Sequence, residues 1–266
     1  ATSYMEVKRE VLNFAGALCQ LGMDRGDRIA LLSEGCNAWV YSELGMLYAG
    51  GVNVPLSIKL TDNEIVFRVE HSQARFLIVS VNFLNRVRGI EGRIGGVEKI
   101  IVIHSDINEG KYVSFELLQR EGEIWRGECE KLLNDRIHAV TEDDLVNISY
   151  TSGTTAEPKG IMLSHRNYVT NVLQSDSLIQ IPAYYRILLF LPWDHSFAHT
   201  VGLYSFMYNG ASLASVDYGQ SGMEYLRNIP VNLQEVKPHI LLSVPALAKN
   251  FRKNIEAGIK GKGRFT

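Results

Sequence analysis

The chain has 266 residues, a length that fits one large domain or two modest ones. Hydrophobic residues make up 46% and charged residues 21% of the chain, as in an ordinary globular protein. The net charge of −2 gives no support for a nucleic-acid partner, and no apolar run approaches the roughly 20 residues that span a membrane.

Helix-like and strand-like segments alternate along the first 104 residues. Two helices are predicted to begin where a glutamate follows a hydroxyl residue three positions later, at Ser3 with Glu6 and at Thr61 with Glu64. The predicted helices cover residues 4–21, 37–48, 61–70 and 82–91, and the predicted strands cover residues 28–33, 75–80 and 99–104. Since the apolar strands show no in/out alternation and helices separate them, the pattern predicts an α/β fold of mostly parallel sheets covered by helices.

A more polar region, residues 108–144, is expected to hold two helices near 114–120 and 124–134 and to form the seam between two halves, 1–140 and 141–266. In the second half, the predicted strands are 160–163, 186–191, 211–216 and 239–244, and the predicted helices are 164–178, 199–208 and 246–257. Residues 218–221 are expected to form a loop.

The sequence YTSGTTAEPKG, residues 150–160, joins two apolar segments that we expect to be buried strands. Its glycines leave backbone N–H groups uncovered, and such groups can converge on an anion. Hydroxyl donors and one ammonium group add to them, from Thr151, Ser152, Thr154, Thr155 and Lys159. This combination suits a polyphosphate better than it suits a plain polar turn, which is the alternative interpretation. It is not a Walker loop, because Pro158 stands where that pattern has its second glycine.

This loop resembles the phosphate loop of the adenylate-forming superfamily, which includes acyl-CoA synthetases, adenylation domains and luciferases, although Ala156 stands where that loop usually has glycine. Four further segments are similar to family motifs: GDRIA at 26–30, AGGVNVPL at 49–56, LPWDH at 191–195 and SVPAL at 243–247. The resemblance covers nearly the whole chain and is greater to long-chain fatty acyl-CoA synthetases than to amino-acid-adenylating enzymes. It implies that residues 1–266 are a partial N-terminal adenylation domain, an incomplete N-terminal region of the adenylate-forming fold, with the C-terminal domain absent.

The resemblance implies a two-step reaction for the full-length protein. ATP and Mg²⁺ activate a long-chain fatty acid as acyl-AMP, and coenzyme A then takes the acyl group. The residues that the resemblance places at the phosphates, with the Thr151 hydroxyl nearest the magnesium, are Thr151, Ser152, Gly153, Thr154, Thr155 and Lys159. It also implies catalytic roles for Lys159 and for His195, which ends the L-P-x-x-H motif beside the reacting carboxylate.

Two features near His195 have competing interpretations. His199 follows at the spacing of a metal-binding pair, but Ser196 stands where the H-E-x-x-H motif has glutamate, so we expect no zinc site. The aromatic residues fit either the lining of an acyl tunnel or plain core, and they are Trp193, Phe197 and Phe206.

Several family motifs are not among the 266 residues, namely the aromatic-Gly-x-Thr-Glu motif, the T-G-D aspartate and the catalytic lysine of the C-terminal domain. We therefore expect the fragment to be inactive alone. Two alternatives stay open: a non-catalytic phosphate- or acyl-binding module, and an aryl- or aminoacyl-adenylating member of the family.

The expected partners are small molecules, namely fatty acid, ATP and coenzyme A, and no nucleic acid. Three cysteines without a C-x-x-C pair, and an N-terminus without the basic-then-apolar order of a secretion signal, favour a cytoplasmic protein. Because long acyl tails partition into bilayers, the sequence leaves a peripheral membrane contact open, and it leaves a homodimer open as well.

Overall fold

The structure of the protein is a computed structural model that describes residues 1–151, 158–219, 221–245, 249, 252–253 and 256. Its helices, with short 3-10 or π-helical turns labelled η, are α1 (Tyr4–Gln20), α2 (Asn37–Tyr48), α3 (Asp62–His71), η1 (Val81–Phe83), α4 (Leu84–Ile90), η2 (Glu91–Arg93), α5 (Phe115–Glu128), α6 (Glu130–Ala139), α7 (His165–Leu178), η3 (Ala198–Tyr204), α8 (Ser205–Tyr208) and α9 (Gly222–Val236). Its strands are β1 (Arg28–Leu32), β2 (Val52–Pro55), β3 (Phe76–Ser80), β4 (Lys99–Ile103), β5 (Tyr112–Ser114), β6 (Leu145–Thr151), β7 (Lys159–Ser164), β8 (Arg186–Leu189) and β9 (Ser212–Ser215). Both predicted capping boxes form, at the starts of α1 and α3.

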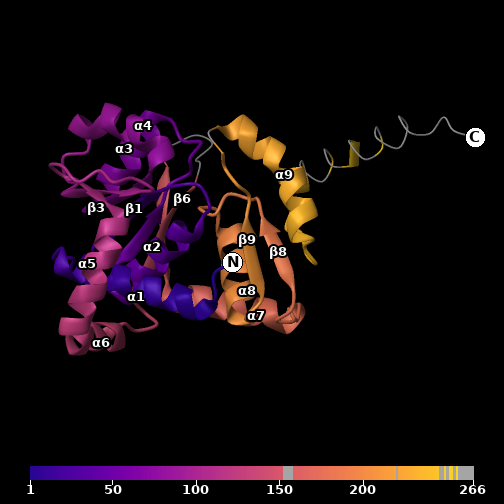
Figure 1. Ribbon diagram of the computed structural model, residues 1–266, viewed down its shortest axis with the longest axis horizontal. Coiled ribbons are helices and arrows are strands. Elements are labelled where there is room, and N and C mark those ends of the chain that lie inside the picture. Colours follow the sequence, from indigo (N-terminus) through magenta and orange to yellow (C-terminus); the bar gives the residue numbers. More distant parts are fainter. Residues whose placement is uncertain (152–157, 220, 246–248, 250–251, 254–255, 257–266) are drawn as a thin grey trace, which may run out of the picture.

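Seven strands form one sheet in the order β5-β4-β3-β1-β2-β6-β7. Every neighbouring pair is parallel except β6 and β7, which form an antiparallel hairpin at one edge. Near the centre, Ile29 of β1 pairs with Asn53 of β2 and with Phe76 of β3. The predicted mostly parallel α/β fold is therefore confirmed, and Figure 1 shows this sheet among its helices.

Helices cover both faces of the sheet, and successive residues of β1 belong to different hydrophobic clusters. Ile29 and Leu31 pack in a cluster with residues of α1, α2 and α5, whereas Ala30 and Leu32 pack in a cluster with residues of α3 and α4. All four side chains are fully buried. The strands show no in/out alternation in the sequence because both faces of the sheet are covered.

A second, smaller sheet pairs β8 with β9 in parallel and contacts α8, α9 and η3. Its core is continuous with that of the first sheet, since Leu189 of β8 and Phe206 of α8 belong to the same hydrophobic cluster as Ile29. The expected seam near residue 140 falls between α6 and β6, yet β6 and β7 complete the first sheet. The division into two halves there stays a prediction about domains.

Two helical regions differ from the expectation. The predicted break between helices at residues 121–123 is wrong, because α5 continues through Gly122 and packs closely on α1 there. A Cβ atom added to Gly122 would lie 1.9 Å from the carbonyl oxygen of Asn13, so the glycine serves the helix contact and not a turn. α9 follows the expected loop directly, in a stretch for which we predict no element, and its N-cap Ser221 accepts from the N–H of Glu224.

The strand predictions also need correction. β7 is an exposed edge strand and not a buried one, with Ile161 44% and Met162 65% exposed, because it lies at the end of the sheet. The strand predicted at 239–244 is reduced to one bridge between Ile240 and Ile187, and the residues after the bridge are largely exposed. β2 and β5 have only four and three residues, too short to stand out in the sequence. Most of the helix predicted at 246–257 lies outside the described residues.

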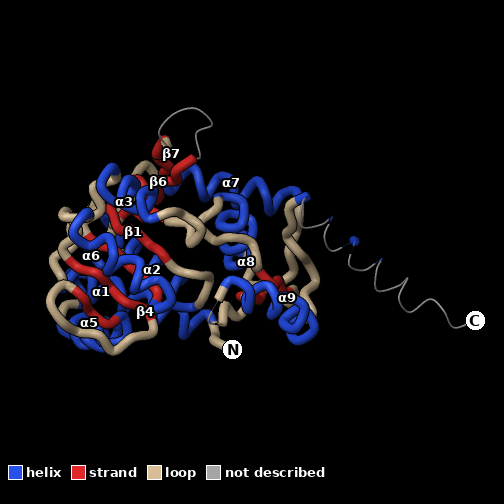
Figure 2. Tube along the Cα trace, turned by 90° about the horizontal axis from the view of Figure 1, so that it is seen from above, coloured by secondary structure: helices blue, strands red, loops and turns tan. Residues whose placement is uncertain are grey.

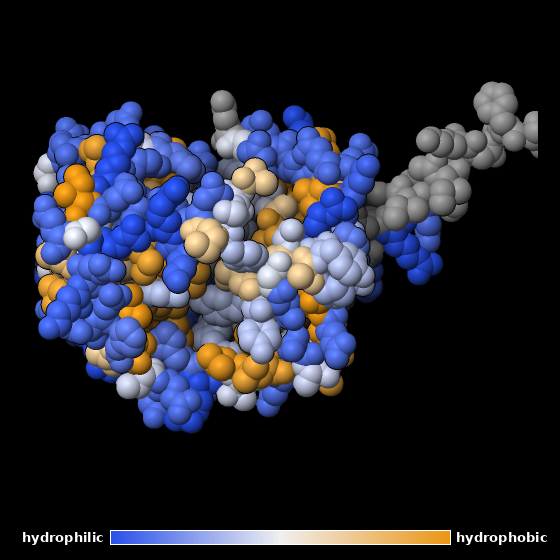
Figure 3. Space-filling model, turned by 60° about the horizontal axis from the view of Figure 1, so that its bottom comes forward, coloured by the Kyte–Doolittle hydropathy of each residue, from blue (hydrophilic) through white to orange (hydrophobic). Residues whose placement is uncertain are grey.

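The surface carries mainly hydrophilic side chains with hydrophobic ones scattered among them, as the face in Figure 3 shows. In the described part of the chain, every helix falls short of the length or apolarity that a bilayer-spanning segment requires. A peripheral membrane contact stays a prediction.

Candidate functional site

The β6–β7 hairpin carries the two described donor residues of the predicted phosphate loop. In its antiparallel register Thr151, the last residue of β6, pairs with Lys159, the first residue of β7, and both are exposed. Directly opposed residues project from the same face of a hairpin, so the hydroxyl and the ammonium group start on one side. The remaining predicted phosphate contacts lie outside the described residues and stay predictions: Ser152, Gly153, Thr154 and Thr155.

Tyr150, one residue before Thr151, is held by side chains of α3, which lies beside the hairpin in Figure 2. Its hydroxyl lies 2.8 Å from Nδ1 of His71, and its ring makes an edge contact with the ring of Phe67. The guanidinium carbon of Arg68 lies 5.7 Å from the centre of the same ring. Burial raises the pKa of Tyr150 above its usual range. These contacts with α3 fix the position of Tyr150, the residue after which the predicted phosphate loop begins.

His195 lies in the turn that leads from β8 into η3, and its ring is exposed. Its backbone N–H donates to the carbonyl oxygen of Pro192 at 3.1 Å, and its Nδ1 accepts from the N–H of Phe197 at 3.3 Å. Because Nδ1 accepts, a neutral ring carries its proton on Nε2. That N–H can donate to an oxygen of a substrate.

Asp194, the neighbour of His195, is a partly buried carboxyl residue. Burial raises the pKa of Asp194, and the electrostatic influence of nearby basic residues, Lys59 and Arg68 among them, acts against that rise. Arg68 therefore packs against Tyr150 at the foot of the loop and also interacts with the residue next to His195.

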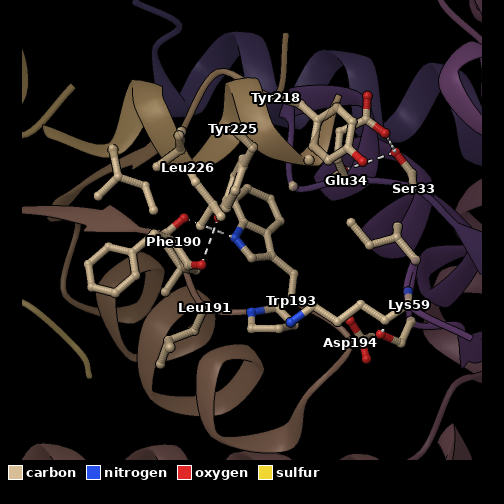
Figure 4. Close-up of a pocket in the computed structure, with 18 of the residues that line it drawn as sticks. Ser33, Glu34, Lys59, Phe190, Leu191, Trp193, Asp194, Tyr218, Tyr225 and Leu226 are labelled. Carbon is tan, nitrogen blue, oxygen red and sulfur yellow. Dashed lines mark hydrogen bonds between the residues drawn. The ribbon is translucent and has the colours of Figure 1, made fainter. Parts of the chain in front are cut away.

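A cavity of about 500 Å³ lies between the carboxyl ends of β1 and β2 and the elements around β8 (Figure 4). Its apolar wall includes Leu189, Phe190, Leu191, Val216, Leu226 and Ile229. Its polar corner is formed by Ser33, Glu34, Ser57, Lys59 and Asp194. The carboxylate of Glu34 accepts from the hydroxyl of Ser80 at 2.5 Å and from the amide of Asn82 at 2.7 Å. The cavity thus lies beyond the carboxyl ends of β1 and β2, the end of the strands at which ligands usually bind in an open parallel sheet.

Of the three aromatic residues proposed for an acyl tunnel, Trp193 lines this cavity. Its Nε1 donates to the carbonyl oxygen of Leu189 at 3.4 Å, and its ring meets that of Trp39 edge-on, with centroids 5.5 Å apart. Phe206 is buried in the core, and Phe197 is exposed. Phe206 is therefore a core residue, whereas Trp193 belongs to the core and also borders the cavity, and an acyl tunnel there stays a prediction.

His199 packs against a carboxylate in the interior. Its Nε2 lies 2.7 Å from Oε1 of Glu43, with side chains 1% and 3% exposed, although the ring N–H does not point at the carboxylate. Asn53 donates to the same oxygen at 2.8 Å. The backbone N–H of His199 donates to the carbonyl oxygen of His195 at 3.0 Å, so this pair anchors the segment that carries His195.

No three His, Cys, Asp or Glu side chains among the described residues form a group that could hold a metal ion. Magnesium bound with a nucleotide usually keeps several waters and is held by phosphate oxygens and one or two carboxylates. The magnesium contact of the Thr151 hydroxyl stays a prediction.

The sequence analysis does not predict three charged residues near the site, namely Glu34, Lys59 and Arg68. Their relation to His195 depends on contacts between segments more than 100 positions apart in the sequence. One signal does exist for Arg68, which shares the buried face of α3 with Ile65 and Val69. A charged residue at an apolar position of a helix is unusual unless it has a partner.

The AMP-binding enzyme family matches residues 1–263 of the chain. The long-chain-fatty-acid–[acyl-carrier-protein] ligase AEE15 of Arabidopsis thaliana is 24% identical over 98% of this chain and 37% of its own length. Fatty acyl-CoA synthetase A of Dictyostelium discoideum is 30% identical over 75% of this chain and 30% of its own. Among solved structures, the anthranilate CoA ligase AuaEII in complex with anthranoyl-AMP superposes with a TM-score of 0.74 at 26% identity, over 90% of this chain and 44% of that one. The chain thus spans less than half the length of these relatives.

Proposed function

Because this chain belongs to the AMP-binding enzyme family, we propose that it is the N-terminal, nucleotide-binding part of an ATP-dependent acyl-CoA ligase that activates a long-chain fatty acid. The observation that carries this proposal is the hairpin register, which sets the Thr151 hydroxyl and the Lys159 ammonium on one face. Both groups donate charge-assisted or neutral hydrogen bonds of the kind that phosphate oxygens accept.

The described residues fit a bound triphosphate. Thr151 and Lys159 supply donors at the two ends of the loop. Arg68, whose Nε has no hydrogen-bond partner, places its guanidinium beside Tyr150, where the loop begins. When bound, magnesium would neutralise phosphate oxygens, and Thr151 is the residue expected to contact it.

In the proposed first step, a carboxylate oxygen of the acid attacks the α-phosphorus of ATP. A new oxygen–phosphorus bond forms and the bond to pyrophosphate breaks, which gives acyl-AMP. The positive charge of Lys159 stabilises the negative charge that builds on the phosphate oxygens, and the Nε2–H of His195 donates to a reacting oxygen and orients it. In the second step the thiol of coenzyme A takes the acyl group and AMP leaves.

The cavity beside Trp193 is the proposed site of the acyl chain. Its wall of aliphatic and aromatic side chains suits a hydrocarbon tail, and its volume is within the range of small-molecule pockets. Asp194 lies on its edge, so an acid in the cavity would have its carboxylate near the ring of His195. An aryl acid is the alternative substrate. A competition binding experiment with a long-chain fatty acid and benzoate shows which of the two acids the protein prefers.

We expect Lys159→Ala to weaken ATP binding about tenfold or more, because a hydrogen bond from a charged group contributes roughly 1.5–3 kcal/mol. Calorimetric titration of ATP with Mg²⁺ into the wild type and the variant measures this. The matched control is Lys131→Ala, which removes an exposed lysine from α6, away from the hairpin in Figure 1. Equal affinities of the Lys159 variant and the wild type would contradict the proposed site.

The same samples, given a long-chain fatty acid as well, are expected to release no pyrophosphate, because the ribose-binding and C-terminal motifs of the family are not among these residues. Robust release would contradict the expectation that the chain is inactive alone. Acid binding without any ATP binding would favour the alternative of a non-catalytic acyl-binding module.

A further inference from the structure

Arg68 is a buried cation that contacts the ring of Tyr150 but pairs with no carboxylate in the described part of the chain. The residue is 6% exposed, and its Nε has no hydrogen-bond partner. Among the residues that the structure describes, its guanidinium takes part in no ion pair and no hydrogen bond. An arginine carries five donors and stays charged, so burial without a partner is costly.

The groups that face Arg68 do not neutralise it. Burial lowers the pKa of Arg68, while Glu64 on its own helix, Asp194 and Tyr150 oppose that shift. Neither carboxylate comes within ion-pair distance of the guanidinium in the described structure. Glu64 is committed to the capping box at Thr61, where it accepts from the backbone N–H and the hydroxyl.

The guanidinium of Arg68 lies close to the start of the predicted phosphate loop. Its guanidinium carbon lies 5.7 Å from the ring centre of Tyr150, and Tyr150 directly precedes Thr151. Arg68 also acts electrostatically on Asp194, next to His195. An anion bound beside Tyr150, where β6 ends, would therefore lie close to Arg68, the arginine of α3.

We propose that Arg68 is an anion-binding residue of this site and that its natural partner is a phosphate-type oxyanion of the nucleotide. The inference rests on the proposed function. A guanidinium presents its donors in a fixed planar fork, which matches two oxygens of a phosphate. The bound anion then supplies a negative charge beside Arg68, where no described carboxylate forms an ion pair with it.

The test compares the wild type with Arg68→Met, which keeps the length and apolar volume of the side chain, and with Arg68→Lys, which keeps the charge. Arg88→Met is the matched control, because Arg88 lies on α4 and is exposed. Melting temperatures and calorimetric affinities are measured with inorganic pyrophosphate, with ATP and with decanoate, at constant ionic strength.

We expect the ligand-free Arg68→Met protein to melt at the same temperature as the wild type or higher, since the change removes an unpaired buried charge. Its affinity for pyrophosphate and ATP should fall about tenfold or more, Arg68→Lys should retain part of it, and Arg88→Met should match the wild type. A residue with a merely structural role would give the opposite result, a lower melting temperature with unchanged affinity.

Four results would overturn the inference: a wild type that does not bind pyrophosphate, an Arg68→Met protein that fails to fold, unchanged pyrophosphate affinity in Arg68→Met, or a loss confined to decanoate. If Lys159→Ala loses ATP binding while Arg68→Met keeps it, the proposed function stands and the role of Arg68 falls. If Arg68 governs pyrophosphate binding but the protein binds no ATP, the anion site stands and the proposed function falls.

Discussion

His199→Leu is expected to lower the free energy of unfolding by about 1–3 kcal/mol, because it leaves the buried carboxyl group of Glu43 with one polar neighbour fewer. Glu43 and His199 are both almost fully buried, and their side-chain atoms approach to 2.7 Å. Asn53 remains as a neutral donor to that carboxylate and cannot replace the lost partner. Urea unfolding followed by circular dichroism measures the loss.

Two further variants show whether the loss comes from the buried charge. Replacing both residues, in Glu43→Leu with His199→Leu, should recover much of the stability, since apolar residues can take the place of two buried polar groups. The control is His195→Leu, an exposed residue on the same segment, which should change the free energy of unfolding by no more than about 0.5 kcal/mol. A loss below about 1 kcal/mol in His199→Leu would contradict the importance of this pair.

Gly122→Ala should destabilise the protein by about 1–3 kcal/mol or more, because it forces α1 and α5 apart. The new Cβ atom would lie 1.9 Å from the carbonyl oxygen of Asn13 and 2.7 Å from the backbone nitrogen of Ala17. Both are backbone atoms of α1, so the clash cannot be relieved by rotating a side chain.

The matched control for Gly122→Ala is Gly127→Ala on the same helix, where an added Cβ meets nothing within 4 Å. Alanine favours a helix over glycine by about 0.5–1 kcal/mol, so this variant should be as stable as the wild type or more stable. Thermal unfolding of the two variants side by side should give shifts of opposite sign, or a shift in Gly122→Ala alone. Equal melting temperatures would contradict the close packing of α1 on α5.

Local signals in the sequence predict the elements that depend on local chemistry. The capping boxes at Ser3 and Thr61 predict the starts of α1 and α3, and both form. The continuation of α5 through Gly122 could not be predicted in this way, because it depends on how near α1 lies. The exposure of β7 likewise depends on its place at the sheet edge, which its apolar residues Ile161 and Met162 do not reveal.

The residues of the candidate site also differ in whether local sequence signals predict them. The loop composition and the L-P-x-x-H motif point to Thr151, Lys159 and His195 from sequence alone, because family chemistry requires those residue types at those spacings. Arg68 and Glu34 come from other segments and reach the site only through the parallel order of β1, β2 and β3. Their positions at the site depend on the folded sheet, although Arg68 has one local signal, its place among the buried residues of α3.

The central claim is that the hairpin between β6 and β7 binds the phosphates of ATP, and a crystal structure of the protein soaked with a nonhydrolysable ATP analogue tests it most directly. The account predicts phosphate density against the face that carries Thr151 and Lys159, with the Lys159 ammonium in hydrogen-bond contact. Phosphates bound elsewhere, or backbone amides of the hairpin turned inward onto neighbouring protein, would contradict it.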